Sequence, residues 1–258
     1  MRLNLINRFN LFFFVFLFLV IIGFSKAESN QVDNLKAEVS RNPKNYQAHF
    51  RLAGELLNAK DYHGAAKEYQ FIIDENEKKR ISIILPFANL SQSLGRVHMG
   101  LGFSLDFLNE DERAIKELNR AIEIDPQLEQ HLMLQITLGA IYGDLGLKEK
   151  ELSKYQKVIE IDPQYYPAYL NLAIALGEIE RVSDAITVLK RVILIKPDYA
   201  KAYNQLGIAY EIMRNYRQSI EHYLIAQKLY SKKNDLDSEK EVNQHLKHLY
   251  KMLGTPHA

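Results

Sequence analysis

The sequence predicts an all-α protein that is built from stacked pairs of helices. Two sets of large side chains recur at a fixed step of 34 residues: Tyr155, Leu189 and Tyr223, and Leu138, Leu172 and Leu206. A unit of this length cannot bury its apolar face alone, so neighbouring units must stack. Stacking produces an extended surface rather than a catalytic pocket.

The composition favours a folded soluble protein over a disordered one, since 47% of the 258 residues are hydrophobic and 25% are charged. The formal net charge is +1, and without residues 1–27 the chain has 30 basic residues against 32 acidic ones. A nearly neutral chain gives no electrostatic argument for nucleic acid as a partner. The absence of cysteine excludes disulfides, thiolate catalysis and cysteine-bound zinc.

The N-terminus resembles a secretory signal. Arg2 and Arg8 precede an apolar run over residues 11–22, and Ser25-Lys26-Ala27 then offers the small residues of a cleavage site. We therefore expect residues 1–27 to be a signal peptide and the protein to be exported, either periplasmic or secreted. The alternative is an uncleaved anchor, because the uncharged residues 9–25 are long enough to span a bilayer. In both cases the positive end stays in the cytoplasm and the remainder crosses the membrane.

The repeat unit is clearest from residue 200 onward. Its first helix carries four residues along one stripe: Tyr203, Leu206, Gly207 and Tyr210. After a polar turn, the second helix carries three on its inner side: Ser219, Tyr223 and Ala226. The small Gly207 lets the two helices approach closely.

This pattern resembles the tetratricopeptide repeat (TPR), whose signature places large and small residues in the same order. The resemblance implies a right-handed superhelical α-solenoid. It covers residues 46–233 as five units, with bounds of about 46–77, 95–128, 132–165, 166–199 and 200–233. Gln135 and His98 stand where an aromatic residue is usual, and Glu151 replaces a small residue, so we expect looser packing there.

The remaining segments fit between and around these units. We expect an insertion at 78–94, whose apolar strip 81–85 is either an interaction element or a buried loop anchor. Residues 28–45 are expected to form an N-terminal capping helix, and 234–258 a C-terminal capping helix and tail. Ser238 and Glu241 are spaced as a capping box at the start of that last helix.

No constellation of catalytic residues is found in the sequence. His245 and His248 are spaced to share a metal ion, but two solvated histidines are the better interpretation because the pattern offers no carboxylate beside them. We expect no enzyme activity, no metal and no cofactor.

The resemblance also implies that the first helix of each unit lines a concave groove for a partner's peptide or helix. Its predicted apolar residues are Phe50, Met99, Phe103, Phe107, Met133, Ile136, Ala140, Leu170, Ile174, Ile208 and Ile212. Its predicted polar residues are Arg51, Asn171, Lys201, Asn204 and Gln205. The alternative is that this apolar stripe packs only against neighbouring helices. The family's carboxylate clamp is not expected, because only Asn171 and Lys201 match it.

Taken together, the sequence predicts an exported scaffold or adaptor that binds other proteins and no nucleic acid. It would touch the membrane only through an uncleaved N-terminal segment. Two alternatives stay open: a self-associating structural protein, and an accessory subunit of an envelope enzyme complex.

Overall fold

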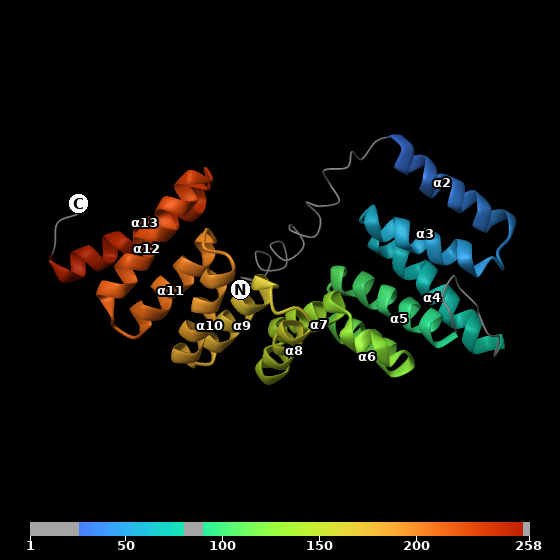
Figure 1. Ribbon diagram of the computed structural model, residues 1–258. Helices are drawn as coiled ribbons and strands as arrows, with labels where there is room; N and C mark the ends of the chain where they lie inside the picture. Colours follow the sequence, from blue (N-terminus) through green and yellow to red (C-terminus); the bar gives the residue numbers. More distant parts are fainter. Residues whose placement is uncertain (1–25, 80–89, 255–258) are drawn as a thin grey trace. The chain divides into compact units, whose positions relative to one another are not determined.

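The computed structural model describes residues 26–79 and 90–254, and these residues form helices and turns without a β-strand. The chain divides into two compact units, and the boundary lies between Leu145 and Gly146. The described helices of unit 1 (Figure 1) are α2 (Lys26–Arg41), α3 (Tyr46–Asn58), α4 (Tyr62–Lys79), α5 (Leu90–Phe107), α6 (Asp111–Ile124), the 3-10 helix η1 (Pro126–Gln130) and α7 (Leu132–Asp144).

Unit 2 contains six further α-helices in its described part: α8 (Lys148–Ile161), α9 (Tyr166–Glu178), α10 (Val182–Ile195), α11 (Ala200–Ile212), α12 (Tyr216–Lys232) and α13 (Leu236–Leu253). The all-α prediction is therefore confirmed. The unit boundary falls between α7 and α8, which are the two helices of the predicted third repeat.

Consecutive helices pack side by side as hairpins, and each hairpin depends on a close approach of its helices. The pairs are α3 with α4, α5 with α6, α9 with α10, and α11 with α12. A Cβ atom at Gly207 would lie 2.5 Å from the Tyr223 ring, and one at Gly102 would lie 2.6 Å from Leu118. Neither glycine can gain a side chain without a shift in its neighbour, which confirms the predicted role of Gly207.

The turn between the first and second helix of each repeat contains one left-handed residue. These residues are Lys60, Asn109, Gly146, Glu180 and Arg214. The following backbone N–H closes the turn on the helix; for example, Asn215 donates to the Tyr210 carbonyl at 2.8 Å. A side chain at such a φ costs about 1–2 kcal/mol; the turn at Gly146 avoids that cost, and asparagine at position 109 tolerates the conformation better than the other side chains do.

The first helix of four of the five repeats is also tied to the segment before it by one of its residues. The side chain at this position reaches a backbone carbonyl six residues earlier: His49 to Pro43 (3.2 Å), Gln135 to Glu129 (2.9 Å), Tyr169 to Pro163 (3.1 Å) and Tyr203 to Pro197 (3.1 Å). We call these residues the anchor residues. The position is the one at which the sequence pattern expects an aromatic residue.

The expectation of looser packing at the unusual residues is wrong. Gln135 is fully buried and its Nε2 atom makes the anchor hydrogen bond, while its Oε1 atom has no partner among the described residues. His98 is buried and its Nδ1 atom lies 2.7 Å from Oε2 of Glu117. Glu151 is buried as well, and Lys148 donates to it at 2.9 Å. Polar partners thus replace the aromatic and small side chains of the pattern.

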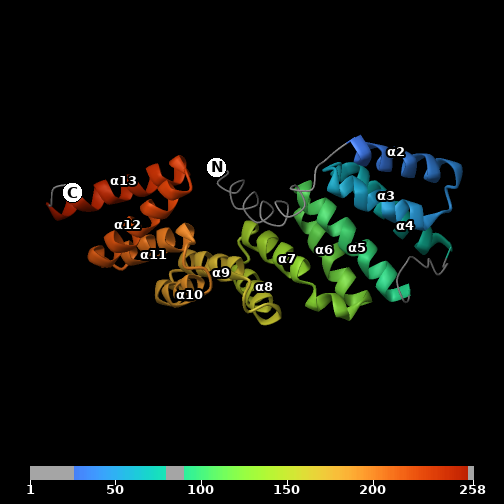
Figure 2. The same cartoon turned by 45° about the horizontal axis from the view of Figure 1, so that its top comes forward.

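Helices cover both ends of the described repeats. Leu35 of α2 is buried in the apolar core of unit 1, and Val32 and Val39 pack against that core. At the other end α13 packs along α12, as Figure 2 shows, and buries Val242, Leu246 and Leu249. The predicted capping box is wrong, because Asp235 caps α13 one turn earlier by accepting from the Ser238 N–H at 3.2 Å.

Some predicted segments lie partly or wholly outside the described residues. These are the signal or anchor segment within 1–27 and the apolar strip 81–85. Among the helices of 26–79 and 90–254, none combines the length and apolar character needed to cross a bilayer.

Candidate partner-binding surface

In unit 1, two predicted groove residues are engaged in aromatic packing between helices. Phe50 of α3 meets Tyr69 edge-on at 5.8 Å between ring centroids. Phe107 of α5 stacks on Tyr62 at 4.2 Å with nearly parallel rings. Of the other predicted groove residues of unit 1, Arg51 is exposed, whereas Phe103 and Met133 are half-exposed.

Three predicted apolar groove residues are buried, so they offer little apolar surface to a partner. Ile136 of α7 is only 1% exposed. Met99 belongs to the apolar core of unit 1, and Leu170 belongs to an apolar cluster of unit 2 that is formed by helices α8 to α11. Helical periodicity places these residues on the expected face, but it cannot show how far a neighbouring helix covers that face.

In unit 2, the predicted residues lie on two neighbouring first helices, α9 and α11. On α9, Asn171 and Ile174 are half-buried. On α11, four residues follow each other at steps of three or four and therefore lie along one face: Lys201, Asn204, Ile208 and Ile212. Gln205 lies beside them and is half-exposed. We call this set of four the α11 face.

The α11 face contains a buried hydrogen-bond acceptor that lacks a donor. Asn204 is 8% exposed, and its Oδ1 atom has no hydrogen-bond partner among the described residues. A buried amide oxygen without a partner costs about 1–3 kcal/mol. Most buried polar atoms in folded proteins have a partner, so this atom invites an explanation.

The same face contains a cation without a direct partner. Lys201 is half-buried and makes no hydrogen bond or ion pair within the part of the chain that is described. Burial lowers the pKa of Lys201 below its ordinary value of 10.5, although the Asp235 carboxylate opposes that shift. At the far end of the face, Ile212 is 58% exposed. The face thus combines a free donor, a free acceptor and an exposed apolar side chain.

Sequence reasoning missed Glu211, which joins three helices next to this face. Its Oε2 atom accepts from the Tyr223 hydroxyl at 2.9 Å and lies 3.2 Å from Nδ1 of His245. Burial, with a further contribution from Glu211, raises the pKa of Tyr223 well above its ordinary value. The repeat pattern gives little sign of this network, because neither Glu211 nor His245 is one of its large or small signature positions.

His245 therefore has a carboxylate partner on α11, and this contact holds α13 against the repeat before it. Within residues 26–79 and 90–254, no three histidine, aspartate or glutamate side chains come together as metal ligands would.

Comparison with known protein families supports a fold of repeated helix pairs. Models of the tetratricopeptide repeat match residues 95–128, 134–165 and 152–206. This chain contains tetratricopeptide repeats. Repeats of this kind form scaffolds for protein–protein interaction, and the chain is built as such a scaffold. No curated protein matches the sequence significantly.

Solved structures of other TPR proteins share the fold. A crystal structure of the MamA protein aligns with a TM-score of 0.60 at 18% identity, over 74% of this chain and 94% of that one. YrrB, described as a TPR protein with an unusual peptide-binding site, gives 0.63 at 15% identity, over 81% and 97%. MamA residues 41 to the end from Desulfovibrio magneticus RS-1 give 0.61 at 15% identity, over 73% and 97%. At these identities the similarity concerns the fold alone.

Proposed function

We propose that this TPR protein is an exported scaffold that holds a peptide or helix of a partner protein against the α11 face of unit 2. Binding is non-covalent and needs no catalytic group. The helices that carry the face are packed before binding, so little conformational entropy is lost when a partner docks.

The observation that carries this proposal is the unpartnered Oδ1 atom of Asn204. Because this oxygen is buried, the proposal includes an outward turn of the Asn204 side chain on binding, so that a peptide backbone N–H supplies the missing donor. A backbone carbonyl or a carboxylate suits the ammonium group of Lys201. Ile208 and Ile212 offer apolar contact along the same face. One short peptide can therefore satisfy all four residues.

The export part of the proposal rests on the sequence of residues 1–27. Two arginines, an apolar run and a small-residue exit favour a signal peptide, with an uncleaved anchor as the alternative. N-terminal sequencing of the protein recovered from its host distinguishes them: cleavage yields a chain that begins near Glu28, and an anchor yields an intact N-terminus.

The substitution Asn204→Leu tests the binding site, because the two side chains have similar shapes. Removing an unpaired buried oxygen should raise the free energy of unfolding by about 1 kcal/mol. The same change should weaken partner binding by about tenfold, since the peptide N–H then loses its acceptor. Urea unfolding and a pull-down of the partner measure the two effects. A variant that loses stability and keeps full binding contradicts the proposal.

Leu224→Ala is a matched control for that experiment. Leu224 is exposed on α12, outside the α11 face. Its substitution should leave both the stability and the binding nearly unchanged.

A further inference from the structure

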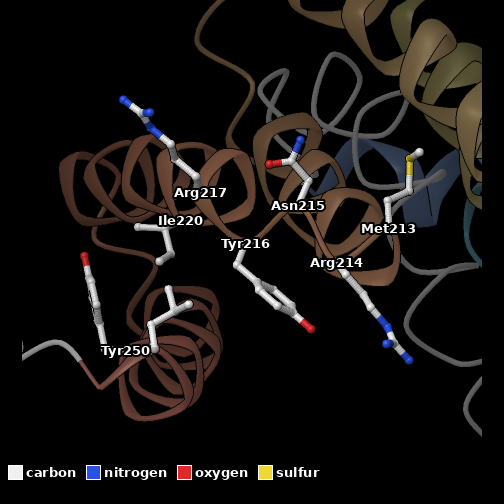
Figure 3. Close-up of a pocket in the computed structure, with 8 residues that line it drawn as sticks. Met213, Arg214, Asn215, Tyr216, Arg217, Ile220 and Tyr250 are labelled. Atoms are coloured by element: carbon white, nitrogen blue, oxygen red, sulfur yellow. The ribbon is translucent and has the colours of Figure 1, made fainter.

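A second surface lies near the C-terminal end of unit 2. The turn between α11 and α12, the start of α12 and the end of α13 border an open depression of about 690 Å³ (Figure 3). We call it the terminal depression. Its apolar residues are Met213, Tyr216, Ile220, Tyr250 and Leu253.

The apolar side of the terminal depression combines fixed and accessible side chains. Ile220, Tyr216 and Tyr250 pack partly against the last apolar cluster, which contains Leu246 and Leu249. Figure 3 shows Ile220 and Tyr250 pointing into the space between α12 and α13. Met213 and Leu253 are about half exposed, at 51% and 46%. The depression thus has a firm apolar wall and an accessible apolar edge.

The charged residues that line the terminal depression are both basic. Arg214 and Arg217 line it and are both exposed, and neither makes an ion pair or hydrogen bond among the described residues. None of the lining residues is acidic, and the first turn of α12 contains no acidic residue. The amino end of α12 adds partial positive charge, and Lys251 lies in the last turn of α13.

The preceding repeat shows that these arginines are not needed to form the turn. At the equivalent positions, 34 residues earlier, that repeat has Glu180 and Ser183. Glu180 adopts φ 63° and Arg214 adopts φ 58°, so the two turns share one backbone conformation. The turn therefore does not require arginine at these two positions, and their charge in the last repeat calls for an explanation other than folding.

We propose that the terminal depression binds an acidic peptide segment of a partner protein, one that combines aspartate or glutamate with a bulky apolar side chain. The apolar side chain contacts Ile220, Tyr250 and Leu253. Carboxylates on either side of it pair with Arg214 and Arg217, since guanidinium groups match carboxylate geometry. This is a second contact on unit 2, separate from the α11 face.

Fluorescence anisotropy with the full-length chain tests this assignment. The probe is a fluorescein-labelled 12-residue peptide of leucine, phenylalanine, aspartate and glutamate, and a second probe has lysine in place of every acidic residue. The double substitution Arg214→Glu/Arg217→Glu should weaken binding of the acidic probe by about tenfold, because two exposed attractions become repulsions. The same variant should bind the lysine probe more tightly than the unmodified protein does.

Three further variants separate the contributions of charge, apolar contact and the α11 face. Arg191→Glu, on the exposed surface of α10, is the matched charge control and should change binding of neither probe. Leu253→Ser should weaken the acidic probe in the unmodified background. Asn204→Leu should leave this probe unaffected, which keeps the test independent of the α11 face.

Equal binding of the acidic probe to the unmodified chain and to the double variant overturns the assignment. It is also overturned if the arginine substitutions lower binding to phosphatidylglycerol vesicles and leave peptide binding unchanged, because the surface would then recognise lipid. Circular dichroism of each variant checks that the helices are retained.

Discussion

The two units of the chain solve the same packing problem with different side chains. At the anchor position, unit 1 has His49, His98 and Gln135, whereas unit 2 has Tyr169 and Tyr203. The Nδ1 atoms of these two histidines also lie close to a glutamate Oε2 atom on the second helix. The distance is 2.5 Å from His49 to Glu68 and 2.7 Å from His98 to Glu117. In unit 2 the corresponding position holds Val188 or His222, which are not acidic.

The comparison shows what the repeat needs at this position. It needs a side chain that fills the space between the two helices, in four of the five repeats also one that reaches the preceding carbonyl, and it does not need an aromatic ring. Where the side chain is a histidine, the second helix places a glutamate beside its Nδ1 atom. The anchor residue and its neighbour therefore have to be exchanged together.

The largest expected effect comes from breaking one of these pairs in unit 1. Glu117→Val removes the partner of His98, whose side chain is buried, so we expect a loss of about 2–3 kcal/mol in the free energy of unfolding. The double variant His98→Tyr/Glu117→Val copies the pair Tyr169 and Val188 of the fourth repeat and should recover most of that loss. Urea unfolding followed by circular dichroism measures both. No recovery in the double variant would mean that the two solutions are not interchangeable.

The second prediction concerns the pH dependence of unit 2. Burial lowers the pKa of His222 below its ordinary value of 6.5, and its Nδ1 atom has no hydrogen bond among the described residues. Its ring stacks on Tyr210 at 5.3 Å. The unfolded chain therefore binds this proton more readily than the folded chain does. The stability that the neutral ring contributes is complete above pH 6.5 and is lost as the pH falls through the folded pKa.

His222→Phe should consequently reduce the drop in thermal midpoint between pH 7 and pH 5. The aromatic ring keeps the stacking on Tyr210 and cannot take up a proton. Calorimetry at several pH values gives the slope. An unchanged slope would remove His222 from the acid response.

The smallest expected effect concerns the left-handed turns. Unit 2 begins with Gly146 at such a turn, while its next two turns use Glu180 and Arg214. Glu180→Gly relieves the unfavourable φ but makes the unfolded chain more flexible, so we expect a net gain of about 0.5 kcal/mol. A loss of stability in urea unfolding would indicate that the Glu180 side chain contributes contacts that outweigh its backbone strain.

Much of the fold follows from the sequence because the signals are local and periodic. The 34-residue step fixes the stripe of Leu206 and Tyr210, and Gly207 marks the point where two helices meet. The anchor hydrogen bonds could not be predicted, since their acceptors are backbone carbonyls that no side-chain pattern reveals. The boundary at Leu145 could not be predicted either, because the repeat pattern continues through it.

The candidate site was only partly predictable. Periodicity correctly places Lys201, Asn204 and Ile212 along one helix. It cannot show that Ile136 is buried, or that the oxygen of Asn204 lacks a donor, because both depend on neighbouring helices. The terminal depression depends on where α13 ends relative to the turn at Arg214, and the repeat pattern does not extend that far.

Site-specific photo-crosslinking tests the central claim most directly. A photoreactive phenylalanine analogue replaces Ile212 on the α11 face, and in a second variant it replaces Leu194, which is exposed on α10. We predict that the residue at 212 captures a defined partner protein and that Asn204→Leu in the same chain reduces this capture about tenfold. Equal capture from positions 212 and 194, or capture that Asn204→Leu leaves unchanged, would contradict the account.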